Sequence, residues 1–176
     1  MRALRLLPME PRHAAAWMRW REQASSQRFN PLLPLPVDYL SHRLATVCTS
    51  DLSDRRRTEY RWLIDFKGEP IGTVAVMNPS WSMGYAEIGY MLCESKQSRG
   101  FGTRAVALLV DKLFTETDLH RIYAMIAPDN TASIRLVERL GFMREGRMRE
   151  HYLIQGRRVD EVVYGLLRRE WQPLQS

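Results

Sequence analysis

Three strand-like segments follow one another in the middle of the chain, with no helical pattern between them. Residues 59–66 and 71–77 are rich in β-branched and aromatic side chains, and the Lys-Gly-Glu-Pro turn at 67–70 separates them. A second turn, which ends at Gly84, leads into a third run over residues 85–93. Strands joined by such short turns pair in antiparallel fashion, so this region predicts a meander. The pattern excludes a doubly wound nucleotide-binding fold, because that fold needs a helix between successive strands.

Helical and strand-like patterns alternate on both sides of this meander. The predicted elements are a strand at 3–7, helices at 11–24 and 38–47, irregular loops at 30–36 and 51–57, a helix at 100–115, a strand at 122–126, a helix at 131–140 closed by Gly141, and two strands around a turn at 155–156 that end near residue 167. The order is therefore β-α-α-β-β-β-α-β-α-β-β. It predicts a single α/β domain of the α+β type with a mixed central sheet.

The composition is that of an ordinary globular domain of 176 residues. No apolar run reaches the roughly 20 residues that span a bilayer, and the first ten residues read as a strand and not as a signal peptide. We therefore expect a cytoplasmic protein without a membrane segment. Cys48 and Cys93 lie outside any metal-binding spacing, so we expect free thiols and no metal. The net charge of +6 fits either a solvated basic surface or attraction to anions such as CoA phosphates or RNA.

The segment Gln97-Ser98-Arg99-Gly100-Phe101-Gly102 lies between the third strand-like run and a predicted helix. The first turn of a helix has unpaired N–H groups and the positive end of the helix dipole, which suit a diphosphate. The glycines would let a phosphate approach the backbone, Arg99 adds a cation and Thr103 adds a hydroxyl. Taken alone, Gly-x-Gly fits a tight turn equally well. The spacing matches neither the P-loop nor the dinucleotide-binding pattern.

Two further segments give this loop a family context. Gln-x-x-Gly-x-Gly after a strand resembles motif A of the GNAT acetyltransferase superfamily. Residues 130–146 look like the second cofactor motif of that superfamily, and residues 149–171 are similar to the tail of its RimJ/RimL branch. The resemblance implies one acetyltransferase domain over 1–176, with a variable acceptor-side portion at 1–58 and a cofactor-binding core at 59–171.

The resemblance implies an enzyme that transfers acetyl directly from acetyl-CoA to a primary amine. In that superfamily the pantetheine arm lies against a splayed strand like an added strand, and backbone N–H groups near Tyr90 and Met91 would meet the oxyanion. The residues that the resemblance assigns to the cofactor are Met91, Leu92, Cys93, Gln97, Arg99, Gly100, Phe101, Gly102, Thr103, Asn130 and Ser133.

Two residues are candidates for proton transfer, because only a neutral amine attacks a thioester and a thiolate must leave. Several members of the superfamily carry a catalytic Glu near the position of Glu87, although a surface Glu paired with an arginine, or a base that acts through water, fits the sequence as well. Many members donate a proton to the thiolate from a Tyr where this chain has Val137. Ser133 is the nearest substitute, unless its hydroxyl only caps its helix. A Glu-x-Glu pattern found in some relatives is incomplete here, since Tyr152 replaces its second Glu and Glu150 alone remains.

The acceptor half of the chain is the least informative. Core packing is the simpler interpretation of Trp17, Trp20, Phe29 and Trp81, and a ring that stacks on the acceptor is the alternative. By analogy with the RimJ/RimL branch, the expected acceptor is a protein N-terminal α-amine. A small amine (a polyamine, an amino-acid conjugate or an aminoglycoside) and a non-catalytic acetyl-CoA-binding module are the alternatives. Few acidic residues lie in the first 60, which argues against a polycation. Ribosome association and a homodimer are both compatible with the sequence.

Overall fold

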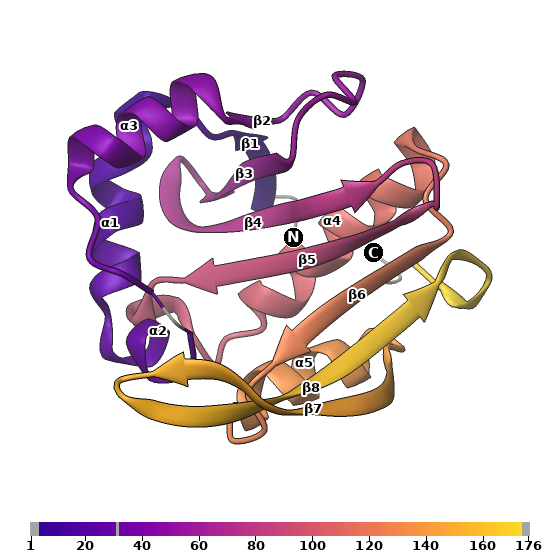
Figure 1. The fold of residues 1–176 in the computed structure, drawn as a ribbon. Coiled ribbons are helices and arrows are strands. Elements are labelled where there is room, and N and C mark those ends of the chain that lie inside the picture. Colours follow the sequence, from indigo (N-terminus) through magenta and orange to yellow (C-terminus); the bar gives the residue numbers. More distant parts are fainter. Residues whose placement is uncertain (1–3, 31, 174–176) are drawn as a thin grey trace.

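A mixed β-sheet forms the centre of the computed structural model, which describes residues 4–30 and 32–173 (Figure 1). The strands are β1 (Leu4–Pro8), β2 (Cys48–Thr49), β3 (Glu59–Phe66), β4 (Glu69–Ser80), β5 (Tyr85–Leu92), β6 (Arg121–Ile126), β7 (Met143–Ile154) and β8 (Arg157–Leu167). Their order in the sheet is β1-β3-β4-β5-β6-β8-β7, and β2 pairs with β3. The helices are α1 (Ala14–Glu22), α2 (Ala24–Phe29), α3 (Val37–Thr46), α4 (Phe101–Glu116) and α5 (Thr131–Arg139).

The predicted meander is confirmed. Strands β3, β4 and β5 pair in antiparallel fashion, and β3 has the predicted bounds. Helix α5 is followed by Gly141 with a φ of +85°, as expected for the residue that closes a helix. The predicted mixed α/β fold is also confirmed, with β5 and β6 as a parallel pair inside the sheet. Residues 3 and 31, which belong to the predicted first strand and first loop, lie outside the described residues.

The predicted helix at 11–24 is wrong in its length and continuity. Residues Pro11–His13 form a 3₁₀ turn, and Gln23 then separates α1 from α2. Gln23 has an extended ψ of 144°, and its side chain reaches the end of β5, where Nε2 donates to the carbonyl of Leu92 at 3.3 Å and Oε1 accepts the N–H of Glu94 at 2.8 Å. The helix therefore breaks where a long-range contact fixes the chain. The short strand β2 was also missed.

Two hydrophobic cores lie on opposite faces of the sheet, because successive strand residues point to opposite sides. Trp62 of β3 belongs to the larger core with α4 and α5, whereas its neighbour Leu63 belongs to the smaller core with α1 and α3. In Figure 1, α4 and α5 lie behind the sheet and α1 to α3 lie along its left side. This arrangement leaves the front of β5, β6 and β8 open among the described elements.

The sheet opens between the parallel strands β5 and β6. The ladder of β5 and β6 runs from Tyr85 opposite Arg121 to Glu87 opposite Tyr123, and the strands diverge beyond it (Figure 1). Strand β6 continues to pair with β8, and β5 with β4. The gap therefore exposes one edge of β5 beside the start of α4.

Candidate active site

The backbone of β5 determines what can pair in the gap. The N–H of Cys93 donates to the carbonyl of Ile71 at 2.9 Å, so it faces β4. Backbone groups alternate in direction along a strand, so those of Met91 also face β4 and those of Tyr90 and Leu92 face the gap. A cofactor arm added along this edge would pair with the backbone of Tyr90 and with the N–H of Leu92, since the Leu92 carbonyl already accepts hydrogen bonds from Gln23 and Gln97. Of the two predicted oxyanion donors, Tyr90 is the one directed to the gap.

The predicted phosphate loop leads into the N-terminus of α4. Gly100 is the residue before the helix and has a φ of +78°, a backbone conformation that favours glycine. Arg99 is exposed, and its guanidinium carbon lies 5.8 Å from the centre of the Phe101 ring. Gly102 has a packing role, since a Cβ there would lie 3.0 Å from a side-chain carbon of Leu136 on α5. The free N–H groups of this helix turn and the cation beside it suit a pyrophosphate.

Gln97 holds this loop in place. Its Nε2 donates to the carbonyl of Leu92 and to Oγ of Ser25, both at 3.2 Å. These bonds tie the loop to the end of β5 and to α2, so Gln97 positions the loop. Thr103 is half-buried in the first turn of α4.

The second predicted motif joins α5 to β5. Oδ1 of Asn130 accepts the N–H of Ser133 at 3.2 Å, so Asn130 caps α5. Oγ of Ser133 lies 2.5 Å from the hydroxyl of Tyr90. The Ser133 hydroxyl therefore forms a hydrogen bond with β5 and does not cap its own helix. Burial raises the pKa of Tyr90 to about 12, against the opposing effect of the bond to Ser133. Val137, where many relatives carry a tyrosine, is fully buried in the larger core.

Glu87, the predicted base, is half-buried on β5 at the last residue pair before the strands diverge. Its side chain lies on the open face of the sheet, since Ala86 and Ile88 on either side point into the larger core. Burial raises the pKa of Glu87 above its usual value. Such a shift brings a carboxylate closer to the basicity that a general base needs near neutral pH.

The sequence analysis did not single out Glu161, on β8, which is 3% exposed. Burial first, and then the negative charge of Glu87, raise the pKa of Glu161 to about 7. A signal was available in the sequence, because two acids, Asp160 and Glu161, stand together between Val159 and Val162 on a predicted strand, and successive strand residues point to opposite faces. Tyr90 was considered only for its backbone, and its hydroxyl contact with Ser133 was also missed.

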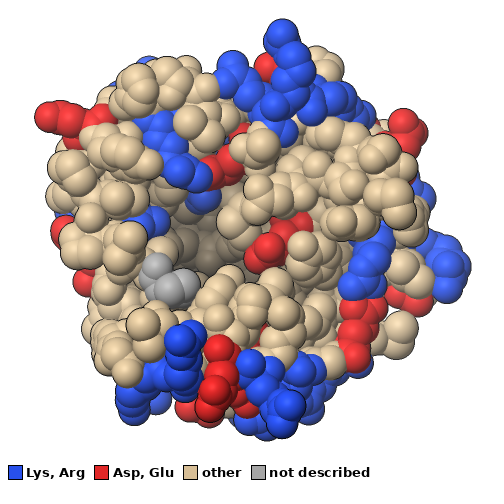
Figure 2. All heavy atoms as spheres, viewed as in Figure 1, with Lys and Arg blue, Asp and Glu red and all other residues tan. Residues whose placement is uncertain are grey.

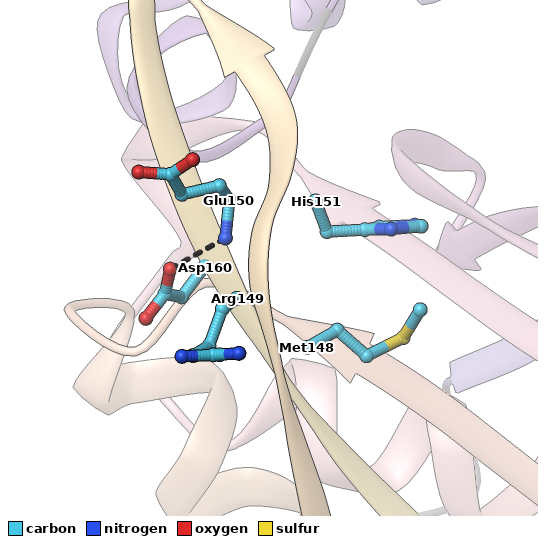
Figure 3. Close-up of a pocket in the computed structure, with 5 residues that line it drawn as sticks. All are labelled: Met148, Arg149, Glu150, His151 and Asp160. Atoms are coloured by element: carbon cyan, nitrogen blue, oxygen red, sulfur yellow. Dashed lines mark hydrogen bonds between the residues drawn. The ribbon is translucent and has the colours of Figure 1, made fainter.

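A bulge in β7 lies beside Glu161. Met148 pairs with Glu161, but Tyr152 pairs with Val159, so β7 carries two extra residues between these pairs. Figure 3 shows the open pocket at this place, with His151 and Met148 pointing to one side of the strand and Arg149 and Glu150 to the other. Asp160 Oδ1 accepts the N–H of Glu150 at 2.7 Å and fixes the bulge.

The tryptophans of the acceptor half are buried. Trp17 is 3% exposed and Trp20 is 6% exposed, and both belong to the smaller core, which agrees with the simpler interpretation. Arg61 lies over the Trp17 ring at 4.3 Å and donates to Glu59 at 2.7 Å. Arg43 pairs with the same carboxylate. Burial alone would raise the pKa of Glu59, but the two arginines outweigh it and hold that pKa below its usual value.

Charge is unevenly distributed over the open face. Figure 2 shows a hollow near the centre of this view with acidic side chains beside it and most basic side chains towards the periphery. Among the described residues, no group of three or more His, Cys, Asp or Glu could hold a metal ion. No helix in the described part of the chain is long and apolar enough to cross a membrane.

The family model described as an acetyltransferase (GNAT) domain matches residues 3–143. The chain belongs to the GNAT acetyltransferase family. The family resemblance and the enzyme class (N-acetyltransferase) are thereby confirmed. Acetyl-CoA as the co-substrate is supported by similar solved structures that contain bound coenzyme A. The uncharacterized N-acetyltransferase p20 of Bacillus licheniformis is 36% identical over 123 residues, which are 69% of each chain.

Two similar proteins differ in their named acceptors. The spermidine N(1)-acetyltransferase of Escherichia coli is 30% identical over 115 residues, which are 64% of this GNAT chain and 62% of that enzyme. The solved structure of RimL, named a ribosomal alpha-N-protein acetyltransferase and bound to coenzyme A, has a TM-score of 0.84 and 21% identity and covers 95% of both chains. The fold is therefore shared by enzymes with different acceptors.

Proposed function

We propose that this GNAT protein acetylates the N-terminal α-amine of a protein, with acetyl-CoA as the acetyl donor, and that Glu87 is the base. The observation that carries the proposal is the position of Glu87. It is half-buried on the open face of the sheet, at the point where β5 and β6 diverge. An amine that enters from this face would meet the carboxylate beside the gap that suits the acetyl donor.

The residues on the other side of β5 fit the departing thiolate. Acetyl-CoA supplies an activated acetyl carbon and a thiolate leaving group. Ser133 would donate a proton to the sulfur, and the Tyr90 hydroxyl, 2.5 Å from Ser133 Oγ, would then donate a proton to Ser133. Tyr90 suits this task because its raised pKa keeps it protonated at neutral pH.

The choice of acceptor rests on charge. The chain has a net charge of +6, which repels a polycation such as spermidine more strongly than a single terminal ammonium. The acidic side chains beside the hollow in Figure 2 can attract one ammonium within this basic surface. A small polyamine, as in the Escherichia coli relative, is the second candidate.

The test measures thiol release from acetyl-CoA with two acceptors, a peptide that begins with a free alanine and spermidine. We expect a higher kcat/KM with the peptide. Glu87→Gln should lower kcat by about 10²–10⁴-fold without weakening acetyl-CoA binding by calorimetry. Ser133→Ala should lower kcat, and Tyr90→Phe should lower it less. Glu116→Gln, a change of an exposed carboxylate on α4, is the control and should leave kcat unchanged.

Two results would contradict the proposal. If spermidine is the better substrate, the acceptor is a polyamine. If Glu87→Gln turns over at the wild-type rate, Glu87 is not the base.

A further inference from the structure

Glu161 is a buried carboxylate that the fold does not neutralise. Its side chain is 4% exposed, and Oε2 has no hydrogen-bond partner among the described residues. Burial of an ionised carboxylate without donors is strongly unfavourable. An acid that is kept in this state near an open face indicates a chemical role.

The register places Glu161 on the same face as Glu87. Glu87 is opposite Tyr123, and Val162 is opposite Ile126. Tyr123 and Ile126 are an odd number of residues apart on β6, so they point to opposite faces. Val162 therefore points into the core with Ile126, and Glu161 points to the open face with Glu87.

Among the described residues, the groups that interact with Glu161 supply no fixed positive charge. They are Glu87 from β5 and His151 and Tyr152 from β7. Nε2 of His151 lies 3.8 Å from Oε2 of Glu161, which is an ion pair only when the ring is protonated. Burial and the neighbouring acidic groups raise the pKa of Tyr152 to about 12, so this tyrosine is neutral. A cation from outside the chain would complete the cluster.

We propose that Glu161 is a positioning residue of the acceptor site, which forms with Glu87 a two-carboxylate unit that attracts the acceptor ammonium and strengthens Glu87 as its base. This inference rests on the proposed function. Glu87 meets the amine, because it is the more exposed of the two. Glu161 acts through its charge, because two interacting carboxylates lose their second proton less readily than either would alone.

The proton balance of the step is complete. One N–H bond of the ammonium breaks and an O–H bond forms on the Glu87–Glu161 unit. The neutral amine then forms the C–N bond to the acetyl carbon while the C–S bond breaks. The second proton lost from nitrogen balances the one that the sulfur receives through Ser133, and the proton on the carboxylates leaves to solvent. The net products are the amide, the thiol and one proton.

The experiment compares Glu161→Gln with wild type in the thiol-release assay from pH 5.5 to 9, with the alanine peptide as acceptor. We expect kcat/KM for the peptide to fall by about tenfold to 100-fold. The acid limb of the pH profile should move to lower pH by about one unit or more, since Glu87 loses its negative neighbour. The KM for acetyl-CoA should stay within about twofold of wild type. Glu116→Gln removes an exposed carboxylate from α4, on the opposite face of the sheet, and should change none of these three quantities.

A second measurement does not depend on turnover. Carboxyl ¹³C NMR of protein labelled at glutamate should reveal one group that titrates near pH 7 in wild type. That titration should be absent in Glu161→Gln and should move to lower pH in Glu87→Gln.

The outcomes separate the two proposals. If Glu87→Gln is inactive but Glu161→Gln keeps the wild-type rate and pH profile, the inference is overturned and the proposed function stands. If wild type acetylates neither peptide nor spermidine, the proposed function fails, and the NMR titration decides alone whether the two carboxylates form a unit. A Glu161 carboxyl that titrates in the usual range of glutamate overturns the inference.

Discussion

Replacement of Glu161 by glutamine should make the protein more stable at pH 8. The pKa of Glu161 is raised from 4.5 to about 7 in the folded protein, by burial and by the charge of Glu87. At about 1.4 kcal/mol for each pH unit between the two values, this difference corresponds to roughly 3 kcal/mol. At pH 8 the carboxylate is ionised in both states, so this amount opposes folding in full. Glutamine removes the charge but leaves a buried amide that costs about 1–2 kcal/mol, so the net gain should be about 1–3 kcal/mol.

The sign of the pH dependence follows from the direction of the shift. An acid with a raised pKa destabilises the folded state above its folded pKa, and the effect disappears below its unfolded pKa. The advantage of Glu161→Gln should therefore be largest at pH 8 and should be lost at pH 4.5, where the cost of the buried amide, about 1–2 kcal/mol, remains. For a chain of this size, 1–3 kcal/mol corresponds to a rise in Tm of roughly 2–12 °C.

Urea unfolding of wild type and Glu161→Gln at pH 8, 6 and 4.5 measures this difference, with Glu150→Gln as the exposed control. A variant that is less stable than wild type at pH 8 would refute the reasoning, because it would mean that the ionised carboxylate is satisfied in the folded protein. A difference that does not depend on pH would refute it as well.

Three other changes test separate parts of the structure. Gly72→Ala would place a Cβ 2.2 Å from a backbone oxygen of β5. The free energy of unfolding, measured in urea, should fall by about 1–3 kcal/mol or more. Gly146→Ala, with open space around the added Cβ, should leave it unchanged. Glu59→Gln leaves two arginines unpaired at a buried site and should cost about 3–5 kcal/mol at pH 7. Because the pKa of Glu59 is lowered, wild type should lose the stability that these ion pairs contribute only as the pH falls below the usual range of glutamate. Equal stability of wild type and Glu59→Gln at pH 7 would contradict the ion-pair account. Burial raises the pKa of Cys48 to about 11, so at pH 8 iodoacetamide should modify the half-buried Cys93 first. Mass spectrometry should show that acetyl-CoA slows the modification of Cys93.

The elements that the sequence predicts well are those whose pattern is local. Strand β3 has the predicted bounds because its residues alternate between two buried faces and a turn at 67–68 ends it. Helix α4 begins within one residue of the prediction, since the conformation of Gly100 fixes its start. The loop at 97–102 is predicted to lead into this helix for the same reason, as its residues are neighbours in the chain.

The parts that the sequence does not predict depend on distant partners. The break at Gln23 is fixed by hydrogen bonds to Leu92 at the end of β5 and to Glu94 just after it, which are distant in the sequence. The role of Glu161 depends on the register of two other strands, because only the pairing through β6 places it on the same face as Glu87. A strand pattern alone gives the face of each residue within its own strand, but not its neighbours across the sheet.

The short ladder between β5 and β6 has a mechanical consequence. Three residue pairs fasten the β6-β8-β7 portion of the sheet to the β1-β3-β4-β5 portion, and beyond them the two portions are held through α4 and α5. This line is where the sheet offers least resistance to being pulled apart. A cofactor arm that pairs with Tyr90 and Leu92 would extend the contact between these two portions of the sheet. Bound acetyl-CoA would therefore stabilise the protein mechanically as well as supply the acetyl group.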